Sequence, residues 1–348
     1  MTEHQKRRRV RIIFTWVTIL ALIGLAYVLR EQILETVRNI GRVNAWALLL
    51  LIPLHVASYY SQGRLYQGIF RVLGERFRTK SMYRLTLELN FINTVFPSGG
   101  VSGFSYLPLR MRDEKVSTAK ATLVQMMRFI LIFVSFQVLL VLGVFFLSLH
   151  GGVNNLTILA AGSLMTLLIV GTSLLAFVIG DRARIRTFFT FVTKAVNGLI
   201  HLVRKSTPET INIERAQNAF IELHENYLHI RKNLKLLKRP LVYALMFSFF
   251  EIASIYTVYL AFGQLVNPGA VIIAYAIANF AGIVSVLPGG IGIYEALMTG
   301  VLVAAGVPAS VSLPVTIMYR VLNMSLALPQ GAYFYYRALH SKPAPAHE

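Results

Sequence analysis

The sequence contains no cysteine, which excludes disulfide bonds and thiol chemistry. It also has no Walker-type phosphate loop, no paired aspartates and no serine in a nucleophile-elbow pattern. The histidines at positions 201, 224 and 229 lack the spacing of a metal site. We therefore expect a protein that is not an enzyme and that carries neither a cofactor nor a bound metal.

Acidic residues are scarce: 15 stand against 34 basic residues, which gives a net charge of +19. A basic balance of this size is typical of nucleic-acid binding, but 55% of the residues are hydrophobic and the mean hydropathy is +0.60. These values predict an all-α polytopic membrane protein with one membrane domain over residues 1–348. The basic residues fall between the apolar stretches, so we interpret them as topology signals and expect no nucleic-acid partner.

Apolar stretches long enough to cross a bilayer predict about six spanning helices. They lie near residues 12–29, 45–62, 119–149, 155–180, 240–263 and 311–336. The tail over residues 338–348 is predicted to be disordered.

Two further apolar segments, 85–109 and 268–308, are each interrupted by the same kind of break. In both, an Asn-Phe pair leads into a proline and two glycines, and an arginine follows 31 or 32 residues after the proline. The first copy consists of Asn90, Pro97, Gly99, Gly100 and Arg128, and the second of Asn279, Pro288, Gly289, Gly290 and Arg320. A repeated break in apolar helices with an intramembrane charge indicates the binding centre of a transport fold.

Basic residues gather in 1–11, 63–84, 110–120 and 181–239. Since positive charge stays cytoplasmic, both termini are expected inside. Segment 85–109 then dips in from the cytoplasm, and segment 268–308 dips in from outside. This predicts two re-entrant helical hairpins in an inverted repeat, with repeat one near 12–150 and repeat two near 155–337. The alternative is that each Pro-Gly-Gly marks an ordinary loop.

The cytoplasmic insertion 181–239 is predicted to contain an amphipathic helical arm. A capping box at Ser206–Glu209 starts the helix, an apolar stripe follows with spacings of three and four, and Pro240 ends it. The stripe either lies on the inner leaflet or packs against the bundle or a second subunit.

Helices that restart after the glycines would aim free backbone N–H groups into the membrane. Arg128 and Arg320 add full positive charge there, and an intramembrane arginine needs a partner. The available acids are Glu295 and Glu251, with Glu88 nearer the cytoplasm. We predict that Glu295 pairs with Arg320, either as a structural pair or as a gate that opens for a phosphate.

The run from Asn279 through Pro288-Gly289-Gly290-Ile291-Gly292-Ile293-Tyr294-Glu295, with Tyr319-Arg320 downstream, resembles the membrane domain of the lysylphosphatidylglycerol synthase/flippase family, of the multiple peptide resistance factor type. It is similar in particular to the stand-alone, YbhN-like members. The resemblance implies phospholipid movement between leaflets of a bacterial cytoplasmic membrane, with Glu295 and Arg320 at positions that the family is thought to use in translocation.

The chain departs from the family in two ways. Nothing in it predicts the soluble synthase domain, so we expect no aminoacyl transfer. The first repeat lacks an acid after its break, where Val101–Ser105 stands instead, and this favours an anionic lipid over an aminoacylated one.

We therefore expect a lipid translocase whose substrate-binding residues are those of the two breaks together with Gly292 and Glu251. Its expected partners are membrane phospholipids, either anionic or aminoacylated, and it could form a homo-oligomer or bind a lipid-synthesis enzyme. The alternatives are an anion channel or small-anion exchanger, an enzyme acting on a lipid-linked substrate, and a scaffold for lipid synthesis.

Overall fold

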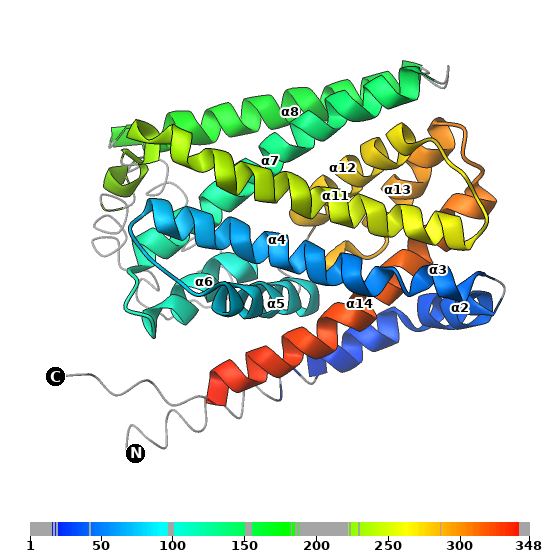
Figure 1. The fold of residues 1–348 in the computed structure, drawn as a ribbon, viewed down its shortest axis with the longest axis horizontal. Coiled ribbons are helices and arrows are strands. Elements are labelled where there is room, and N and C mark those ends of the chain that lie inside the picture. The colour runs from blue at the N-terminus through cyan, green and yellow to red at the C-terminus, as the bar shows by residue number, and fades with distance from the viewer. Residues whose placement is uncertain are drawn as a thin grey trace, which may run out of the picture.

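The computed structural model describes residues 16, 18, 20–41, 43–96, 101–149, 155–181, 183, 184, 187, 222, 224–228, 230–285 and 287–340. Within these ranges the regular structure is helical throughout, and Figure 1 shows the arrangement. The elements are α2 (Arg30–Ile40), α3 (Ala45–Leu48), α4 (Leu51–Val72), α5 (Thr79–Val95), α6 (Val101–Arg112), α7 (Thr118–Ser148), α8 (Asn155–Ile179), η1 (Leu234–Leu237), α11 (Lys238–Ala261), α12 (Pro268–Val284), η2 (Pro288–Gly290), α13 (Ile293–Ala304) and α14 (Ala309–His340). The fold class predicted from composition is thus confirmed at the level of an all-helical bundle.

Four helices among the described residues are long and apolar enough to cross a membrane. They comprise residues 118–148, 155–174, 234–261 and 309–340, which match four of the predicted spans. The predicted span 12–29 lies partly outside the described residues. The predicted span 45–62 is divided between the four-residue α3 and the longer α4.

The shift of α4 has a physical reason. One face of α4 packs against neighbouring helices and carries polar side chains, among them His55, Ser58 and Gln62. Hydrogen bonds hold part of this set, such as Ser58 to Glu251 and His55 Nδ1 to Asn323. A hydropathy window centred on 45–62 therefore misses the second half of the helix.

Two series of four helices repeat along the chain with nearly the same lengths. The first series, α4 to α7, has 22, 17, 12 and 31 residues. The second series, α11 to α14, has 24, 17, 12 and 32 residues. In both, the 17- and 12-residue helices flank the Pro-Gly-Gly break, and the arginine of the repeated pattern lies on the long last helix.

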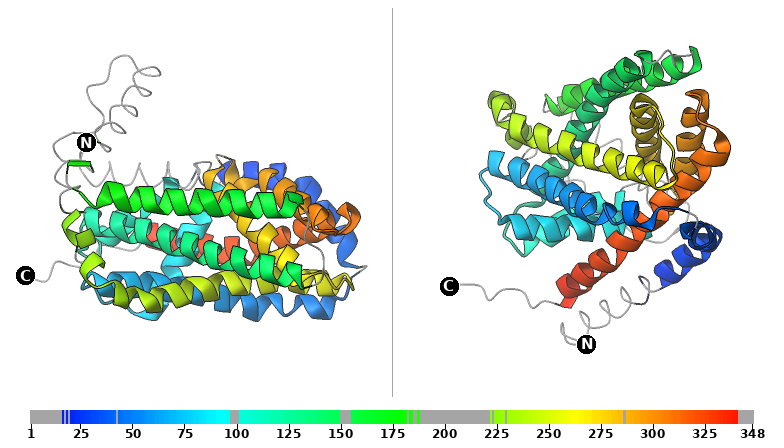
Figure 2. Two further views of the ribbon diagram at one scale, coloured as in Figure 1. Left: turned by 90° about the horizontal axis from the view of Figure 1, so that it is seen from above. Right: turned by 45° about the vertical axis from the view of Figure 1, so that its right-hand side comes forward.

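The two series pack reciprocally. Helices α4 and α11 lie side by side, α5 packs against α14, and α12 packs against α7. The α5–α6 pair lies toward one end of the bundle and the α12–α13 pair toward the other, as both Figure 1 and Figure 2 show. Each helical hairpin therefore packs against the long helix of the other series.

Glycines allow these crossings to be close. A Cβ on Gly331 of α14 would lie 2.7 Å from the carbonyl oxygen of Leu87 in α5, and a Cβ on Gly143 of α7 would lie 3.3 Å from the carbonyl oxygen of Gly269 in α12. Small residues at helix crossings are typical of membrane bundles, where backbones must approach for van der Waals contact.

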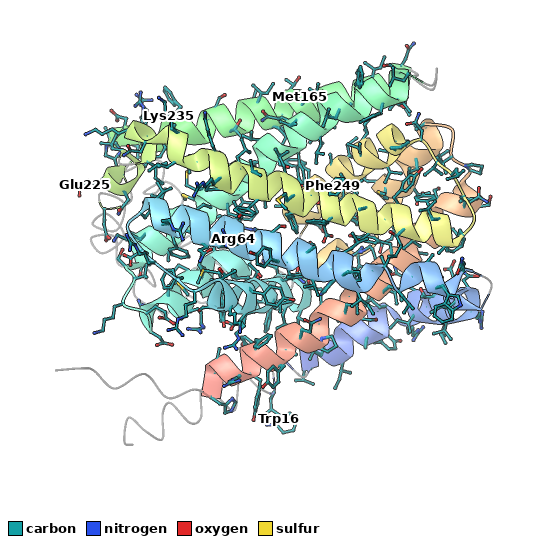
Figure 3. All side chains as sticks on the ribbon, in the orientation of Figure 1. Trp16, Arg64, Met165, Glu225, Lys235 and Phe249 are labelled. Atoms are coloured by element: carbon teal, nitrogen blue, oxygen red, sulfur yellow. The ribbon has the colours of Figure 1, made fainter. Side chains whose placement is uncertain are left out.

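The flanks of the bundle are apolar and one of its ends is charged. Exposed side chains on the flanks include Phe145, Leu159, Leu167 and Phe249. Figure 3 shows Phe249 and Met165 along the sides, with Glu225 and Lys235 together at one end. An apolar belt of this kind is stable in lipid and costly in water.

The predicted amphipathic arm is only partly described, and its predicted end is wrong. Residues 224–228 and 230–232 are helical, but a turn at Asn233 and the 3-10 helix η1 interrupt the stripe before Pro240. Pro240 does not end a helix; it lies in the first turn of α11, where a missing N–H is tolerated. The disordered tail predicted over 338–348 is wrong for residues 338–340, which belong to the last turn of α14. Residues 341–348 and the capping box at 206–209 lie outside the described residues.

Candidate functional site

A cavity of about 250 Å³ lies between the two series of helices, and we call it the central cavity. It is lined by residues of seven helices, α4, α5, α7, α11, α12, α13 and α14, and by Gly289 of the second break. Its polar and charged lining residues are Tyr59, Gln62, Asn90, Asn93, Thr94, Arg128, Glu251, Tyr275, Asn279, Tyr294, Tyr319, Arg320 and Asn323. Both asparagines and both arginines of the repeated pattern therefore face one space.

The predicted ion pair between Glu295 and Arg320 is confirmed. Arg320 Nη1 donates to Glu295 Oε1 at 2.6 Å, and each side chain is 6% exposed. Arg320 Nη2 donates to the carbonyl oxygen of Gly289 at 2.5 Å, and the guanidinium lies 4.8 Å from the ring centroid of Tyr294. The second break, α13 and α14 are thus joined at one arginine.

The second carboxylate oxygen of Glu295 holds the start of α13. Glu295 Oε2 accepts from the backbone N–H of Gly292 at 2.7 Å, which satisfies one of the free donors of the first turn. A carboxylate at a helix N-terminus also compensates the positive end of the helix dipole. The negative charge of Glu295 therefore offsets positive charge from two sources, the Arg320 guanidinium and the N-terminus of α13.

The second break depends on left-handed backbone. Gly289, Gly290 and Gly292 have φ values of 58°, 67° and 84°, a region that costs other residues about 1–2 kcal/mol. A Cβ on Gly290 would also lie 3.0 Å from the Cα of Gly282 in α12. The chain can therefore turn from α12 into α13 only with glycine at this position.

Replacing Gly290 with alanine is expected to lower the free energy of unfolding by about 2 kcal/mol, from left-handed strain and the contact with Gly282. Gly300 is the matched control, because it lies on α13 with nothing within 4 Å of its Cβ position. Gly300→Ala is expected to leave stability unchanged or to raise it by up to about 1 kcal/mol. Unfolding in detergent, followed by circular dichroism, measures both, and equal stability of the two variants would contradict the argument.

Arg128 differs from its counterpart Arg320 in having no acid partner. Among the described residues it forms neither an ion pair nor a hydrogen bond, and its buried Nε has no acceptor. Its guanidinium lies 5.6 Å from the ring centroid of Tyr66 and 5.2 Å from that of Phe129. The expectation that each intramembrane arginine has a carboxylate partner is therefore wrong for Arg128 within the described part of the chain.

At the start of α6 the hydrogen-bond acceptor is an amide rather than an acid. Asn93 Oδ1 accepts from the backbone N–H of Gly103 at 3.0 Å and from Ser102 Oγ at 3.1 Å, near the start of α6. A neutral amide does not compensate the helix dipole as Glu295 does in the second half. Pro97, Gly99 and Gly100, which were predicted to shape the first break, lie outside the described residues.

Glu251 faces the cavity but pairs with neither arginine. Its Oε1 accepts from Ser58 Oγ at 2.5 Å, and its Oε2 accepts from the hydroxyl of Tyr319 at 2.7 Å. Glu88 also has its own partners, since its Oε2 accepts from Tyr106 at 2.8 Å and from Arg110 Nε at 3.3 Å.

Some of the other predicted residues line the cavity, and the rest position the residues that do. Asn90 and Asn279 line the cavity, and Asn279 Nδ2 donates to the carbonyl oxygen of Tyr275 at 3.0 Å. Gly289 lines it as well, whereas Pro288, Gly290, Gly292 and Glu295 are not among its lining residues and position those that are.

Several lining residues were not predicted from the sequence. Asn93 follows Asn90 by three positions, and Asn323 follows Tyr319 by four, so both pairs lie on one face of their helices. Polar residues three or four positions from Asn90 and from Tyr319 could therefore have been identified as lining residues from the sequence.

Comparison with known proteins shows the family to which the chain belongs. The family model for the lysylphosphatidylglycerol synthase TM region matches residues 11–329. UPF0104 membrane proteins of Methanothermobacter thermautotrophicus align at 37% identity over 24% of this chain and 25% of the relative, and at 31% identity over 31% and 33%. A UPF0104 membrane protein of Pyrococcus horikoshii aligns at 25% identity over 45% of this chain and 49% of the relative.

The matched segments thus span less than half the length of each of these relatives. The family model, in contrast, covers nearly the whole chain, from the first basic segment into α14. The resemblance predicted from the second break is therefore confirmed: the protein is a membrane protein and belongs to the family of the lysylphosphatidylglycerol synthase transmembrane region.

Proposed function

We propose that this protein is a lipid translocase that moves a phosphate-bearing phospholipid between the leaflets of a cytoplasmic membrane. The observation that carries the proposal is the central cavity, where Arg128 and Arg320 of the two halves meet and Arg128 has no acid partner among the described residues. An uncompensated arginine in an apolar environment is costly. A phosphate, which accepts two parallel hydrogen bonds from a guanidinium, removes that cost.

The size of the cavity fits a headgroup better than a whole lipid. Its volume of about 250 Å³ lies below the roughly 300–1,000 Å³ of pockets that enclose a drug-sized ligand. The acyl chains would stay in the bilayer while the headgroup passes through the protein. A bare ion needs a narrow ring of close ligands, and this favours a polyatomic anion.

We further propose that the two series form an inverted repeat and that α5–α6 and α12–α13 are re-entrant hairpins. Helices of 17 and 12 residues are about 26 and 18 Å long at about 1.5 Å per residue, shorter than a hydrocarbon core of about 30 Å. The two hairpins lie toward opposite ends of the bundle. Entry from opposite faces would bring the two breaks together near the midplane, as in transporters with discontinuous helices.

In this proposal the basic end of the bundle and both termini are cytoplasmic, and the protein binds phospholipid without chemical conversion. Transport is facilitated or driven by an ion gradient.

Reconstitution tests the function directly. The protein is placed in liposomes of phosphatidylglycerol that contain a headgroup-labelled tracer of the same lipid, and the accessibility of the label to an impermeant quencher is followed. We expect tracer exchange between leaflets to be at least tenfold faster than in protein-free liposomes. A parallel chloride-flux measurement on the same vesicles is expected to show no leak.

If no tracer moves under any ion gradient while chloride crosses, the anion-channel alternative replaces the translocase. Tracer exchange accompanied by loss of vesicle contents would reveal a damaged bilayer rather than transport, so retention of an encapsulated dye is recorded in each preparation.

A further inference from the structure

The two carboxylates of the site differ in the kind of group that they bind. Glu295 accepts from the Arg320 guanidinium and from the backbone N–H of Gly292. Glu251 accepts only from hydroxyl groups, those of Ser58 and Tyr319. Guanidinium and amide N–H groups can only donate, whereas a hydroxyl can donate or accept.

This difference decides which acid can take up a proton without losing its partners. A protonated Glu295 would present an O–H to a group that has no acceptor, and it would leave Arg320 uncompensated. A protonated Glu251 can donate its new O–H to Ser58, whose hydroxyl then rotates to accept, and it keeps the bond from Tyr319. Glu251 can therefore be neutral or charged within the same network, and Glu295 cannot.

The network of Glu251 extends to a second proton-binding group. Asn323 Nδ2 donates to the Tyr319 hydroxyl at 3.4 Å, and Asn323 Oδ1 lies 3.2 Å from His55 Nδ1. Because an amide oxygen only accepts, Nδ1 of His55 is the donor in this contact. His55 is 4% exposed, and its Nε2 is buried without a partner among the described residues.

The other titratable and charged groups that line the cavity around Glu251 come from α4, α7, α12, α13 and α14. The arginines Arg128 of α7 and Arg320 of α14 line the same space. Four tyrosines, Tyr59 of α4, Tyr275 of α12, Tyr294 of α13 and Tyr319 of α14, line it as well. Glu295 binds Arg320, so among the described lining residues Glu251 is the carboxylate whose charge offsets that of Arg128 when the cavity is empty, although no hydrogen bond joins the two.

We propose that Glu251 takes up a proton when an anionic headgroup binds beside Arg128 and releases it when the headgroup leaves. The inference rests on the proposed function and names its coupling ion. The two arginines and the two carboxylates Glu251 and Glu295 sum to zero in the empty site, so an entering monoanion would make the site negative. A proton from bulk water on the Glu251 carboxylate restores neutrality, and each bound headgroup is accompanied by one proton.

Isothermal titration calorimetry of the full chain in detergent measures this proton directly. Phosphatidylglycerol is titrated in buffers of different ionisation enthalpy, and the slope of the observed enthalpy gives the protons taken up per lipid. For the wild type we expect close to one proton near neutral pH, with an affinity that falls up to tenfold per unit rise in pH. Glu251→Gln is expected to bind the lipid with an uptake near zero and a flat pH dependence.

Glu88→Gln is the matched control. Glu88 is buried and accepts from Tyr106 and Arg110, but it does not line the cavity, so its variant is expected to take up the same proton as the wild type. Glycerol phosphate, titrated in parallel, distinguishes recognition of the phosphate alone from recognition of the lipid.

Wild-type binding of either ligand without proton uptake overturns the inference and leaves the translocase proposal standing. Undiminished uptake in Glu251→Gln overturns the assignment to Glu251. If neither ligand binds the wild type at any pH, the proposed function itself fails, and this inference fails with it.

Discussion

Replacing Arg320 with alanine is expected to destabilise the protein by about 3–5 kcal/mol, the usual cost of removing one partner of a buried ion pair. The carboxylate of Glu295 would remain buried with one backbone N–H as its donor, and the carbonyl oxygen of Gly289 would lose the guanidinium. Glu295→Ala is expected to have an effect of similar size, because it leaves the arginine alone. Unfolding in detergent measures each change.

The double variant Arg320→Ala with Glu295→Ala tests whether the pair itself is responsible. If it is, the double variant is expected to lose at least about 1 kcal/mol less than the sum of the single variants. The control pair is Lys120–Glu75, at 2.8 Å with both side chains 29% exposed. Lys120→Ala is expected to cost less than about 1 kcal/mol. Additive effects in the Arg320–Glu295 cycle would show that the pair does not hold the second hairpin to α14.

Helix positions could be predicted from the sequence where an apolar run is bounded by a residue that favours a helix end, such as a capping asparagine or a proline in the first turn. Helix α12 is an example, because Pro268 occupies its first turn and Asn267 Oδ1 accepts from the N–H of Gly269. Helix α4 is the opposite case, since its second half buries polar residues such as Gln67. Hydropathy measures contact with lipid, so a helix that packs inside the bundle falls below its threshold.

The site could be predicted in part because both halves repeat one pattern. The recurrence of asparagine, Pro-Gly-Gly and arginine marks residues that the fold brings to one cavity. The partner of Arg320 could also be predicted, because Glu295 is the acid in the following half-helix. The partners of Glu251 could not, since Ser58 lies 193 residues away and Tyr319 lies 68 residues away, and only packing of α4, α11 and α14 brings them together.

The sequence shows that the first half lacks an acid after its break. It does not show the consequence, which is that Arg128 has no acid partner among the described residues. The lack of an acid after the first break indicated an asymmetric site, and the structure has Asn93 at this place instead of a carboxylate. That Arg128 would then have no partner among the described residues follows from the positions of Glu88 and Glu251, each of which binds elsewhere. Composition and spacing carry no information on that choice.

Replacing Arg128 with alanine is expected to reduce lipid exchange by about 10- to 150-fold, the equivalent of about 1.5–3 kcal/mol for hydrogen bonds to a charged group. Stability is expected to change by less than about 1 kcal/mol, because Arg128 has no ion pair to lose among the described residues and its buried Nε lacks an acceptor. Arg128→Lys keeps the charge without the planar fork of donors and is expected to retain part of the activity. The liposome tracer assay measures transport, and unfolding in detergent measures stability.

Arg64 supplies a closely matched control. It is partly buried like Arg128 and lies near two aromatic rings, 5.9 Å from the centroid of Tyr60 and 5.1 Å from that of Tyr243, but it does not line the central cavity. Arg64→Ala, at the position labelled on α4 in Figure 3, is expected to exchange lipid at the wild-type rate. Wild-type transport in Arg128→Ala would mean that the headgroup does not pass through this cavity.

We therefore expect opposite results for the two arginines: replacing Arg320 lowers stability, whereas replacing Arg128 lowers transport and leaves stability nearly unchanged. Loss of Arg320 removes a group that the second break, α13 and α14 share, so its effect on transport cannot be separated from its effect on the fold. Arg128 contributes no such bond, and a partly buried cation whose Nε has no acceptor does not stabilise the fold. A residue retained without stabilising the fold is explained by a ligand that satisfies it, so a stable but inactive Arg128→Ala protein is the result that identifies an anion-binding site.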